Sequence, residues 1–305
     1  MGKSNWYKGN IHTHTTESDG DAEPEVVTRW YRRHGYDFLV LSDHNHLTLL
    51  EYGDRKRRFK RPLMVPGEEV TTNILGGTVP VHINGIGISR VVEPIDAGGI
   101  VATLQANVNA IRDAGGIASI NHPNLRWAFD HNAIKQVTGA SLLEIFNGHP
   151  GSNNLGGSGK PSAPEIWDGV LSSGKAIFGV ATDDSHKYHD YSLDMSNPGR
   201  GWVFVRAEEL TTEAMVNGLS SGEFYASTGV TLRDLCLSED KLEIEIQQNA
   251  YQVYNTTFSG MDGVVLKQSG CLKSSYRPRG DEGYVRVTVL SSAGGMAWCQ
   301  PVFLD

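Results

Sequence analysis

The amino-acid sequence predicts an α/β fold followed by a small β module. In the first two thirds of the chain, short and continuously apolar runs alternate with longer segments that suit helices. This alternation is typical of repeated strand–helix units, which build either a barrel or an open parallel sheet. After about residue 227, polar and apolar residues alternate instead, which is the pattern of antiparallel strands with one buried face.

Five apolar runs are predicted to be buried strands. Each is apolar throughout, as a parallel sheet covered on both faces requires. They are FLVL (38–41), PLMV (62–65), GIASI (116–120), LLEIF (142–146) and AIFGVA (176–181). The helices predicted between them are Ala22–His34, Ile100–Ala114 and Ala163–Ser173. Gly35 follows the first helix and Gly115-Gly116 follows the second, and glycine commonly lies just beyond the end of a helix.

The last quarter of the chain is predicted to be a small antiparallel, β-sandwich-like module. The segments 241–247 (KLEIEIQ) and 285–290 (VRVTVL) alternate with period two, and glycine-containing turn signals separate them. We therefore predict two domains, 1–227 and 228–305, with the linker near residues 226–232.

Composition restricts the partners of the protein. The 305 residues carry a formal net charge of −8, which argues against a nucleic-acid grip built on phosphate neutralisation. We find no apolar stretch near the roughly 18 residues of a membrane span, and the N-terminus lacks the apolar core of a signal peptide. We expect a cytoplasmic protein that acts on a small molecule, although a removed leader would leave no trace. The oligomeric state is not indicated.

Histidine, aspartate and glutamate recur where predicted strands end. His12 and His14 lie two residues apart in GNIHTHT, so on a strand both imidazoles point to the same face. Further members of this pattern are Asp19, Asp43, His44, Glu68, Glu69, His82, His122, Glu144, Asp184 and His186. Each one alone has a plain structural interpretation, such as a polar strand end, a loop cap or a core histidine. The repetition at separate strand ends is what favours a common site.

Strand ends distant in sequence meet at one rim when parallel strands close into a barrel, and barrel enzymes carry their active sites there. Mixed imidazole and carboxylate ligands suit Zn²⁺, Mn²⁺ or Fe²⁺ better than Ca²⁺ or a thiolate site. The pattern therefore predicts a metal centre.

The order of these motifs, HTH, D, SDHN, GEE, H, NHP and DxH, resembles the PHP (polymerase and histidinol phosphatase) superfamily over about residues 6–205. The resemblance implies a distorted (β/α)₇ barrel with a trinuclear site. The later stretch 199–229 (GRGWVFVRAEELTTEAMVNGLSSGEFYASTG) resembles the carbaryl-hydrolase-like (CehA/McbA) branch. That branch implies an appended β module and extends the substrates from phosphate esters to carboxylic and carbamate esters.

The resemblance also implies how two or three divalent ions would be held. The three sets of ligands are His12, His14, Glu69 and Asp184; Asp19, His44 and His186; and Glu69, His82 and His122. Within GEE we choose Glu69 over Glu68 because Glu69 directly precedes the apolar Val70. Asp43 would orient a ligand histidine from behind.

A metal-bridging hydroxide is the expected nucleophile, because bound metal ions lower the pKa of water toward neutrality. His44, Asp184 and His186 are the residues expected at the reacting centre. The leaving group needs a proton, for which His44, His186 and a metal-bound water are equal candidates. Three basic residues lie just beyond motif positions and could contact an anionic substrate, although ordinary surface cations are an equal interpretation: Arg126, Lys187 and Arg200.

Three functions fit these residues. The first is a phosphoesterase that acts on a small phosphorylated metabolite. The second is a carboxylic ester or carbamate hydrolase of the CehA/McbA type. The third is a non-catalytic PHP module that keeps its metal for structure or binding. The complete ligand set argues against the third, because a module released from catalysis could lose ligands freely. Basic side chains around the metals would favour phosphate, and an apolar pocket would favour a neutral ester.

Overall fold

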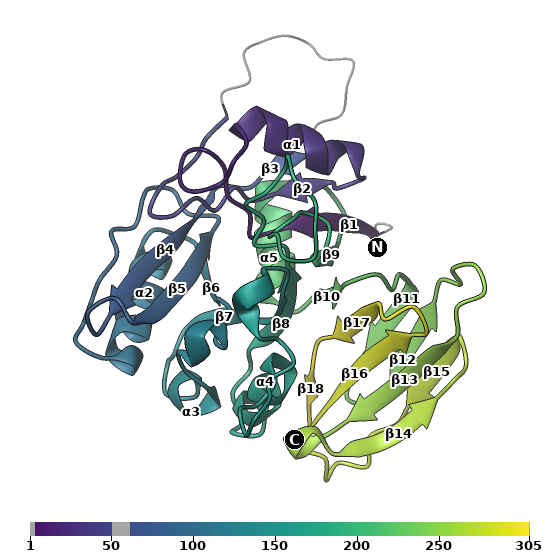
Figure 1. Cartoon of the computed structure of the whole chain (residues 1–305). Helices are drawn as coiled ribbons and strands as arrows, with labels where there is room; N and C mark the ends of the chain where they lie inside the picture. The colour runs from purple at the N-terminus through teal and green to yellow at the C-terminus, as the bar shows by residue number, and fades with distance from the viewer. Residues whose placement is uncertain (1–3, 51–61, 305) are drawn as a thin grey trace.

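The computed structural model describes residues 4–50 and 62–304 and has a mixed α/β part followed by a β-rich C-terminal part (Figure 1). Its helices are α1 (Pro24–Arg33), α2 (Ile100–Asp113), α3 (His131–Ile134), α4 (Ala163–Leu171) and α5 (Thr212–Ser220), with short 3₁₀ turns η1 (Leu125–Trp127), η2 (Pro150–Ser152) and η3 (Met261–Gly263). Among the described residues, no helix is both long and apolar enough to cross a membrane.

The strands before residue 228 are β1 (Asn5–Asn10), β2 (Phe38–Leu39), β3 (Leu63–Met64), β4 (Gly67–Ile74), β5 (Val79–Ile86), β6 (Ile117–Ile120), β7 (Ala140–Asn147), β8 (Phe178–Thr182), β9 (Trp202–Ala207) and β10 (Phe224–Ser227). Those after it are β11 (Leu232–Leu237), β12 (Leu242–Ile246), β13 (Tyr254–Ser259), β14 (Val265–Ser269), β15 (Lys273–Tyr276), β16 (Tyr284–Ser291), β17 (Met296–Cys299) and β18 (Val302–Phe303).

The α/β part is built on two sheets rather than one. A five-stranded sheet has the order β4-β5-β6-β7-β8, in which β6–β7 and β7–β8 are parallel. The pairs β4–β5 and β5–β6 are antiparallel, and β4 and β5 are strands that the sequence patterns did not predict. A tight turn joins β4 to β5, because Leu75, Gly76 and Gly77 all have positive φ angles and return the chain directly into a hairpin.

The second sheet continues into the C-terminal part of the chain. Its order is β14-β13-β16-β17-β10-β9-β1-β2-β3, with β18 attached to β16. The pairs β1–β2 and β2–β3 are parallel, whereas β1–β9, β9–β10 and β10–β17 are antiparallel. One sheet therefore spans both sides of residue 227.

The ladders of the described strands do not form a closed (β/α)₇ barrel. The two sheets instead approach each other at the ends of their strands, where two isolated parallel bridges join Thr13 to Ser185 and His44 to Glu69. The first bridge joins the segments that follow β1 and β8, and the second joins the segment that follows β2 to β4. The convergence of strand ends that the sequence predicts is thus achieved with fewer helices and less regular pairing than a complete barrel would have.

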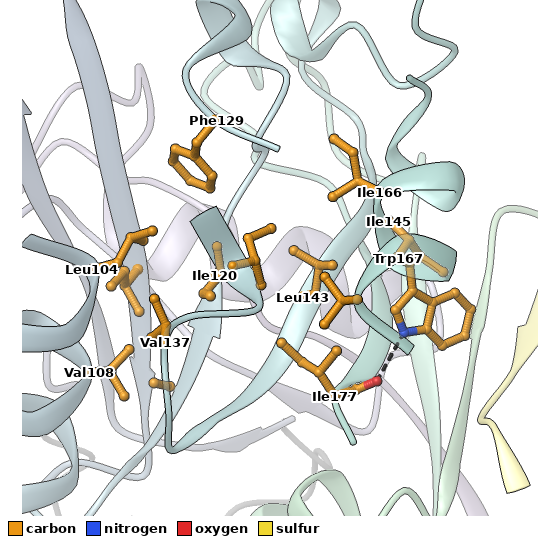
Figure 2. Packing of buried hydrophobic residues seen from close by; sticks show 14 of the residues in the cluster. Leu104, Val108, Ile120, Phe129, Val137, Leu143, Ile145, Ile166, Trp167 and Ile177 are labelled. Carbon is orange, nitrogen blue, oxygen red and sulfur yellow. Dashed lines mark hydrogen bonds between the residues drawn. The ribbon is translucent and has the colours of Figure 1, made fainter. Parts of the chain in front are cut away.

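The apolar strand residues pack against the helices as their patterns predict. Leu104 and Val108 on α2 and Trp167 on α4 are fully buried, and they belong to one core cluster with Ile120 and Leu143 of the five-stranded sheet (Figure 2). The indole of Trp167 donates a hydrogen bond of 2.9 Å to the carbonyl of Ile177 (Figure 2). The predicted bounds of α1, α2 and α4 agree with the structure within two residues.

The C-terminal β-rich part has a second apolar core. The three-stranded sheet β11-β12-β15 contributes Leu235 and Ile244, which cluster with Phe258 of β13 and Val287 of β16. The two segments predicted to alternate, 241–247 and 285–290, contain β12 and most of β16. The two sheets of this part therefore share one apolar core.

A buried ion pair joins α4 to β16. The guanidinium of Arg286 donates two hydrogen bonds of 2.6 Å to the two carboxylate oxygens of Asp168, and the hydroxyl of Tyr284 donates a third, of 2.7 Å. Asp168 and Arg286 are 7% exposed each. Removing one partner of such a pair is costly because it leaves a buried charge without compensation.

We therefore expect Asp168→Asn to lower the free energy of unfolding by about 3–5 kcal/mol, measured by urea denaturation at pH 7. Adding Arg286→Met should restore more than half of the loss, because the unpaired charge is then removed. The exposed pair Arg233–Glu245 is the control, and Glu245→Gln should cost less than about 1 kcal/mol. Equal losses for Asp168→Asn and Glu245→Gln would contradict this account.

Candidate metal centre

The nine side chains predicted as metal ligands lie together where the strand ends converge. Four overlapping groups, each with its ligand atoms within 4.8 Å of one another, contain all nine. The groups are His14, Asp19, His44 and His186; His12, His14 and Glu69; His12, His122 and Asp184; and Glu69, His82 and His122.

Glu69 lies at the centre of the cluster. It belongs to β4, is 1% exposed, and its two carboxylate oxygens lie 2.9 to 3.5 Å from ring nitrogens of five histidines: His12, His14, His44, His82 and His122. Glu68 points elsewhere, because neighbouring residues on a strand face opposite sides. A carboxylate oxygen of Glu68 accepts a hydrogen bond of 2.5 Å from the main-chain N–H of Val92. Glu69 is thus the glutamate of GEE that reaches the histidines.

Asp184 forms the second anionic part of the cluster. Its Oδ1 atom lies 3.2 Å from Nε2 of His12 and 3.2 Å from Nε2 of His14. The residue has a φ angle of 47°, a conformation that costs about 1–3 kcal/mol for a residue other than glycine. Its main-chain N–H donates to the carbonyl of His12 at 2.9 Å, and Asn147 donates to its Oδ2 atom at 3.1 Å. These bonds hold the carboxylate toward the two imidazoles.

Asp19 is on the solvent side. Its side chain is 55% exposed, and its oxygens lie 3.2 Å from Nε2 of His186 and 3.5 Å from Nε2 of His44. His14 also approaches Asp19, with Nδ1 and Oδ1 separated by 3.6 Å. His14 therefore stands between the inner carboxylates and the outer one, whereas the resemblance implies that it belongs to the inner set alone.

The arrangement of ring nitrogens fits bound cations. Within the described part of the chain, Nε2 of His12, Nε2 of His14 and both ring nitrogens of His82 are buried without a hydrogen-bond partner. Each unsatisfied buried polar atom costs about 1–3 kcal/mol, and here they face buried carboxylates. Metal ions coordinated by these atoms would satisfy the imidazole lone pairs and neutralise the carboxylates.

Charge and burial set the protonation of the cluster. Burial opposes a charge on His12, but the carboxylates of Asp184, Glu144 and Glu69 outweigh it and raise its pKa well above the usual value. Burial, together with the positive charge of His186, lowers the pKa of His14 to about 4. Burial also lowers the pKa of His82. His14 and His82 are therefore neutral imidazoles at pH 7, the form that binds metal.

Glu144 orients His12 from behind. It is 1% exposed, and one of its oxygens lies 2.6 Å from Nδ1 of His12 and accepts a hydrogen bond of 2.6 Å from the hydroxyl of Thr182. Its other oxygen accepts from the main-chain N–H of His122 and the amide of Asn147, both at 2.8 Å. The sequence pattern included Glu144 without giving it a role, and the geometry makes it the carboxylate that directs Nε2 of His12 into the cluster.

Asp43 was expected in that role, and its contacts differ. The hydrogen bonds that Asp43 accepts from the described residues come from Thr15, Ser18 and Thr48. Ser18 in turn lies 3.3 Å from Nδ1 of His14. Asp43 thus shapes the loop before Asp19 and reaches a histidine only through Ser18. Thr15 and Ser18 have short side chains, and their donor atoms lie 2.7 to 2.9 Å from the carboxylate of Asp43. They occupy the position in which an imidazole was expected.

The three cations expected near the substrate are placed differently from one another. Arg126 is exposed, and its guanidinium donates to the carbonyl of Gly77 at 3.4 Å. Arg200 donates to the carbonyls of Gly148 at 2.9 Å and Ser192 at 2.7 Å. Lys187 is half-buried one residue beyond His186. Arg200 therefore links the loops that contain Gly148 and Ser192. Its guanidinium has fewer free N–H groups left to bind an anion.

Two residues of the site were not singled out in the sequence. Asn147 holds Asp184 and Glu144 through its amide, as described above, and the ring of His149 lies 5.9 Å from that of His186, edge to face. Both follow the apolar run 142–146, so the same pattern of polar residues after a strand could have found them. Burial and the imidazole of His186, among other neighbours, lower the pKa of His149.

No family model and no curated protein matches the sequence. The fold is similar to that of a two-domain protein from Bacteroides vulgatus described as containing a predicted PHP-like metal-dependent phosphoesterase, with 17% identity, a TM-score of 0.53, and coverage of 98% of this chain and 96% of that chain. This likeness extends over both parts of the chain and shows a shared fold. It agrees with the PHP resemblance read from the motifs, whereas the CehA/McbA branch stays a prediction.

Two further solved structures are similar over less of the chain. One is an amidohydrolase from Chromobacterium violaceum with bound sulfate and no metal, at 15% identity and a TM-score of 0.39, covering 59% of this chain and 88% of that chain. The other is a proposed metal-dependent phosphoesterase from Bifidobacterium adolescentis, at 14% identity and a TM-score of 0.40, covering 62% of this chain and 89% of that chain.

The position of Glu144 generates a test. We expect Glu144→Gln to weaken Zn²⁺ or Mn²⁺ binding about 10- to 100-fold, as loss of the partner behind a ligand histidine does. Competition against a chromophoric chelator measures the affinity. The control is Glu25→Gln, at an exposed position in the first turn of α1. Unchanged affinity in Glu144→Gln, with the fold intact by circular dichroism, would remove Glu144 from the site.

Proposed function

We propose that the protein is a metal-dependent hydrolase with two or three divalent ions of Zn, Mn or Fe, and that its first candidate substrate is a small phosphate ester. The observation that carries the proposal is the convergence of nine imidazole and carboxylate side chains around Glu69. Within the described residues, ring nitrogens of His12, His14 and His82 have no hydrogen-bond partner and lie near carboxylate oxygens. A purely structural cluster of buried histidines would have its nitrogens satisfied by protein groups.

The residues divide by depth. His12, Glu69, His82 and His122 are at most 9% exposed and would hold ions at the bottom of the site. The side chains of His44 and His186 are 26% and 16% exposed, and with Asp19 they would hold an ion at the opening. Bound ions would supply a water of lowered pKa as nucleophile and charge stabilisation for the substrate oxygens.

The more open histidines are the best placed to exchange protons. Burial opposes a charge on His44, but Glu69 and Asp19 outweigh it and raise its pKa to about 10. The same kind of balance, with Asp19 and Asp184 as partners, raises the pKa of His186. A histidine that binds a metal ion does so as a neutral imidazole, so these raised pKa values apply before metal is bound. In turnover the leaving group would take its proton from a metal-bound water, or from His44 or His186 if that histidine is not coordinated.

Phosphate comes first because of the PHP-like motif order and the fold shared with the Bacteroides vulgatus protein described as a predicted PHP-like metal-dependent phosphoesterase. A carboxylic ester or carbamate is the second candidate, and a specific observation favours it. The cavity beside the cluster is lined mainly by uncharged residues, and Arg200 is engaged with main-chain carbonyls.

The proposal is tested with purified protein loaded with Mn²⁺ or Zn²⁺. We expect elemental analysis to find at least two transition-metal ions per chain. We expect hydrolysis of p-nitrophenyl phosphate, and His12→Ala and Asp184→Ala should each lower kcat/KM by at least 100-fold because they remove inner ligands. His34→Ala, at an exposed histidine outside the cluster, is the matched control and should retain activity.

Parallel assays with p-nitrophenyl acetate and an aryl carbamate separate the two chemistries. Activity on the carbonyl substrates alone would replace the first candidate by the second. Metal binding without hydrolysis of any of the three would favour a non-catalytic module. A protein that binds no transition metal when metal is supplied in excess would overturn the proposal.

A further inference from the structure

We propose that a cavity beside the histidine cluster, walled partly by the C-terminal β-rich part of the chain, binds an uncharged apolar group of the substrate next to the bond that is cut. This inference rests on the proposed hydrolytic function and names the substrate class: esters, of phosphate or of a carboxylic acid, that carry an aromatic or bulky aliphatic group.

The cavity adjoins the cluster through two of its lining residues. Its volume is about 640 Å³, within the range of about 300–1,000 Å³ that small-molecule sites occupy. Asn147 and His149 line it, and the same two residues contact the cluster, Asn147 through Asp184 and His149 through the ring of His186. A substrate held at the ions would therefore extend a neighbouring group into this cavity.

The walls of the cavity are largely apolar. Phe146 of β7 and Trp298 of β17 both line it, and their rings are stacked with centroids 6.2 Å apart. Met296 of β17 lies beside them and is half-buried. Leu155 lines the cavity from the loop after η2 and is 92% exposed. An apolar ligand would cover side chains that are otherwise left to solvent.

The lining of the cavity offers little free positive charge to an anionic group. Among the described residues that line the cavity, Arg200 is the one with a formal charge at any ordinary pH. Its guanidinium already donates to two carbonyls and to Oδ1 of Asn197. The remaining polar atoms belong to main chain, amide, hydroxyl and imidazole groups, which suit an uncharged ligand.

One wall of the cavity is formed by β17, which lies near the C-terminal end of the chain. Trp298 and Met296 are positioned by the pairing of β17 with β10 and β16, and the main-chain N–H and carbonyl of Met296 both bond to Thr228. The proposal therefore assigns substrate specificity to Met296 and Trp298, which lie outside all of the metal-ligand motifs.

Substitution of Met296 tests the cavity. Met296→Trp should fill it, so kcat/KM for phenyl phosphate or phenyl acetate should fall at least tenfold, while methyl phosphate or methyl acetate should change less than twofold. Met261→Trp is the matched control, because Met261 is also in the C-terminal part, is 46% exposed and is outside the cavity. Equal losses for phenyl and methyl substrates in Met296→Trp would overturn the proposal.

A second pair of variants avoids the packed region. Leu155→Asp places a charge at the cavity. It should lower kcat/KM for phenyl substrates at least fivefold and leave kcat/KM for methyl substrates unchanged. Leu193→Asp is the control, because Leu193 is 91% exposed and does not line the cavity. The same effect in both variants would contradict a role for the cavity.

Binding of p-cresol to metal-depleted protein separates this proposal from the hydrolytic one. Isothermal titration should show binding to the natural sequence that weakens at least tenfold in Met296→Trp and is retained in Met261→Trp. This result without hydrolysis of any ester would support the cavity and reject the catalytic function. Hydrolysis of esters with no p-cresol binding, and no preference for phenyl over methyl substrates, would support the catalytic function and reject the cavity.

Discussion

The buried carboxylate of Glu69 is the constraint on which the arrangement of the strand ends depends. A buried carboxylate is costly unless positive charge or hydrogen bonds compensate it, and here five imidazoles surround it. The main chain of the same residue joins the two sheets, because its N–H donates to the carbonyl of Asp43 at 3.2 Å and its carbonyl accepts from Asn45 at 2.9 Å. Glu69 therefore has two roles: its main chain joins the two sheets, and its side chain carries the negative charge that the histidines surround.

Buried polar groups behind the cluster hold the surrounding loops. Asp183 is fully buried and accepts hydrogen bonds from the main-chain N–H groups of Gly199, Arg200 and Gly201 and from the hydroxyl of Tyr31. Glu144 does the same for His12 and the main chain of His122. Such fully bonded networks restrict side chains to one geometry, and this rigidity accounts for the φ angle that Asp184 maintains. The cluster is thus preorganised by its supporting layer.

Sequence patterns predicted the composition of the cluster better than the path of the chain around it. The i, i+2 spacing of His12 and His14 needed only the period of an extended chain. The β4–β5 hairpin was missed because β4 (GEEVTTNI) has no simple alternation of polar and apolar residues, although β5 (VPVHINGI) begins with one. Pairing direction also depends on partners distant in sequence. Asp43 was expected directly behind a ligand histidine, and the structure places Ser18 between Asp43 and His14. A local motif does not show which donors fold against a carboxylate. The role of Glu144 could be recognised only from the folded structure, which places its carboxylate beside Nδ1 of His12.

The C-terminal part is attached in a way that matters for specificity. The sheet passes from β9 through β10 to β17, and the buried pair of Asp168 with Arg286 joins α4 to β16. These two connections lie on either side of the cavity wall that Met296 and Trp298 form. The main chain of the wall is therefore held by strand pairing on both sides, and we expect changes in its side chains to alter the shape of the cavity without moving a ligand histidine. In the proposed function, different segments of the chain would carry substrate selection and bond cleavage.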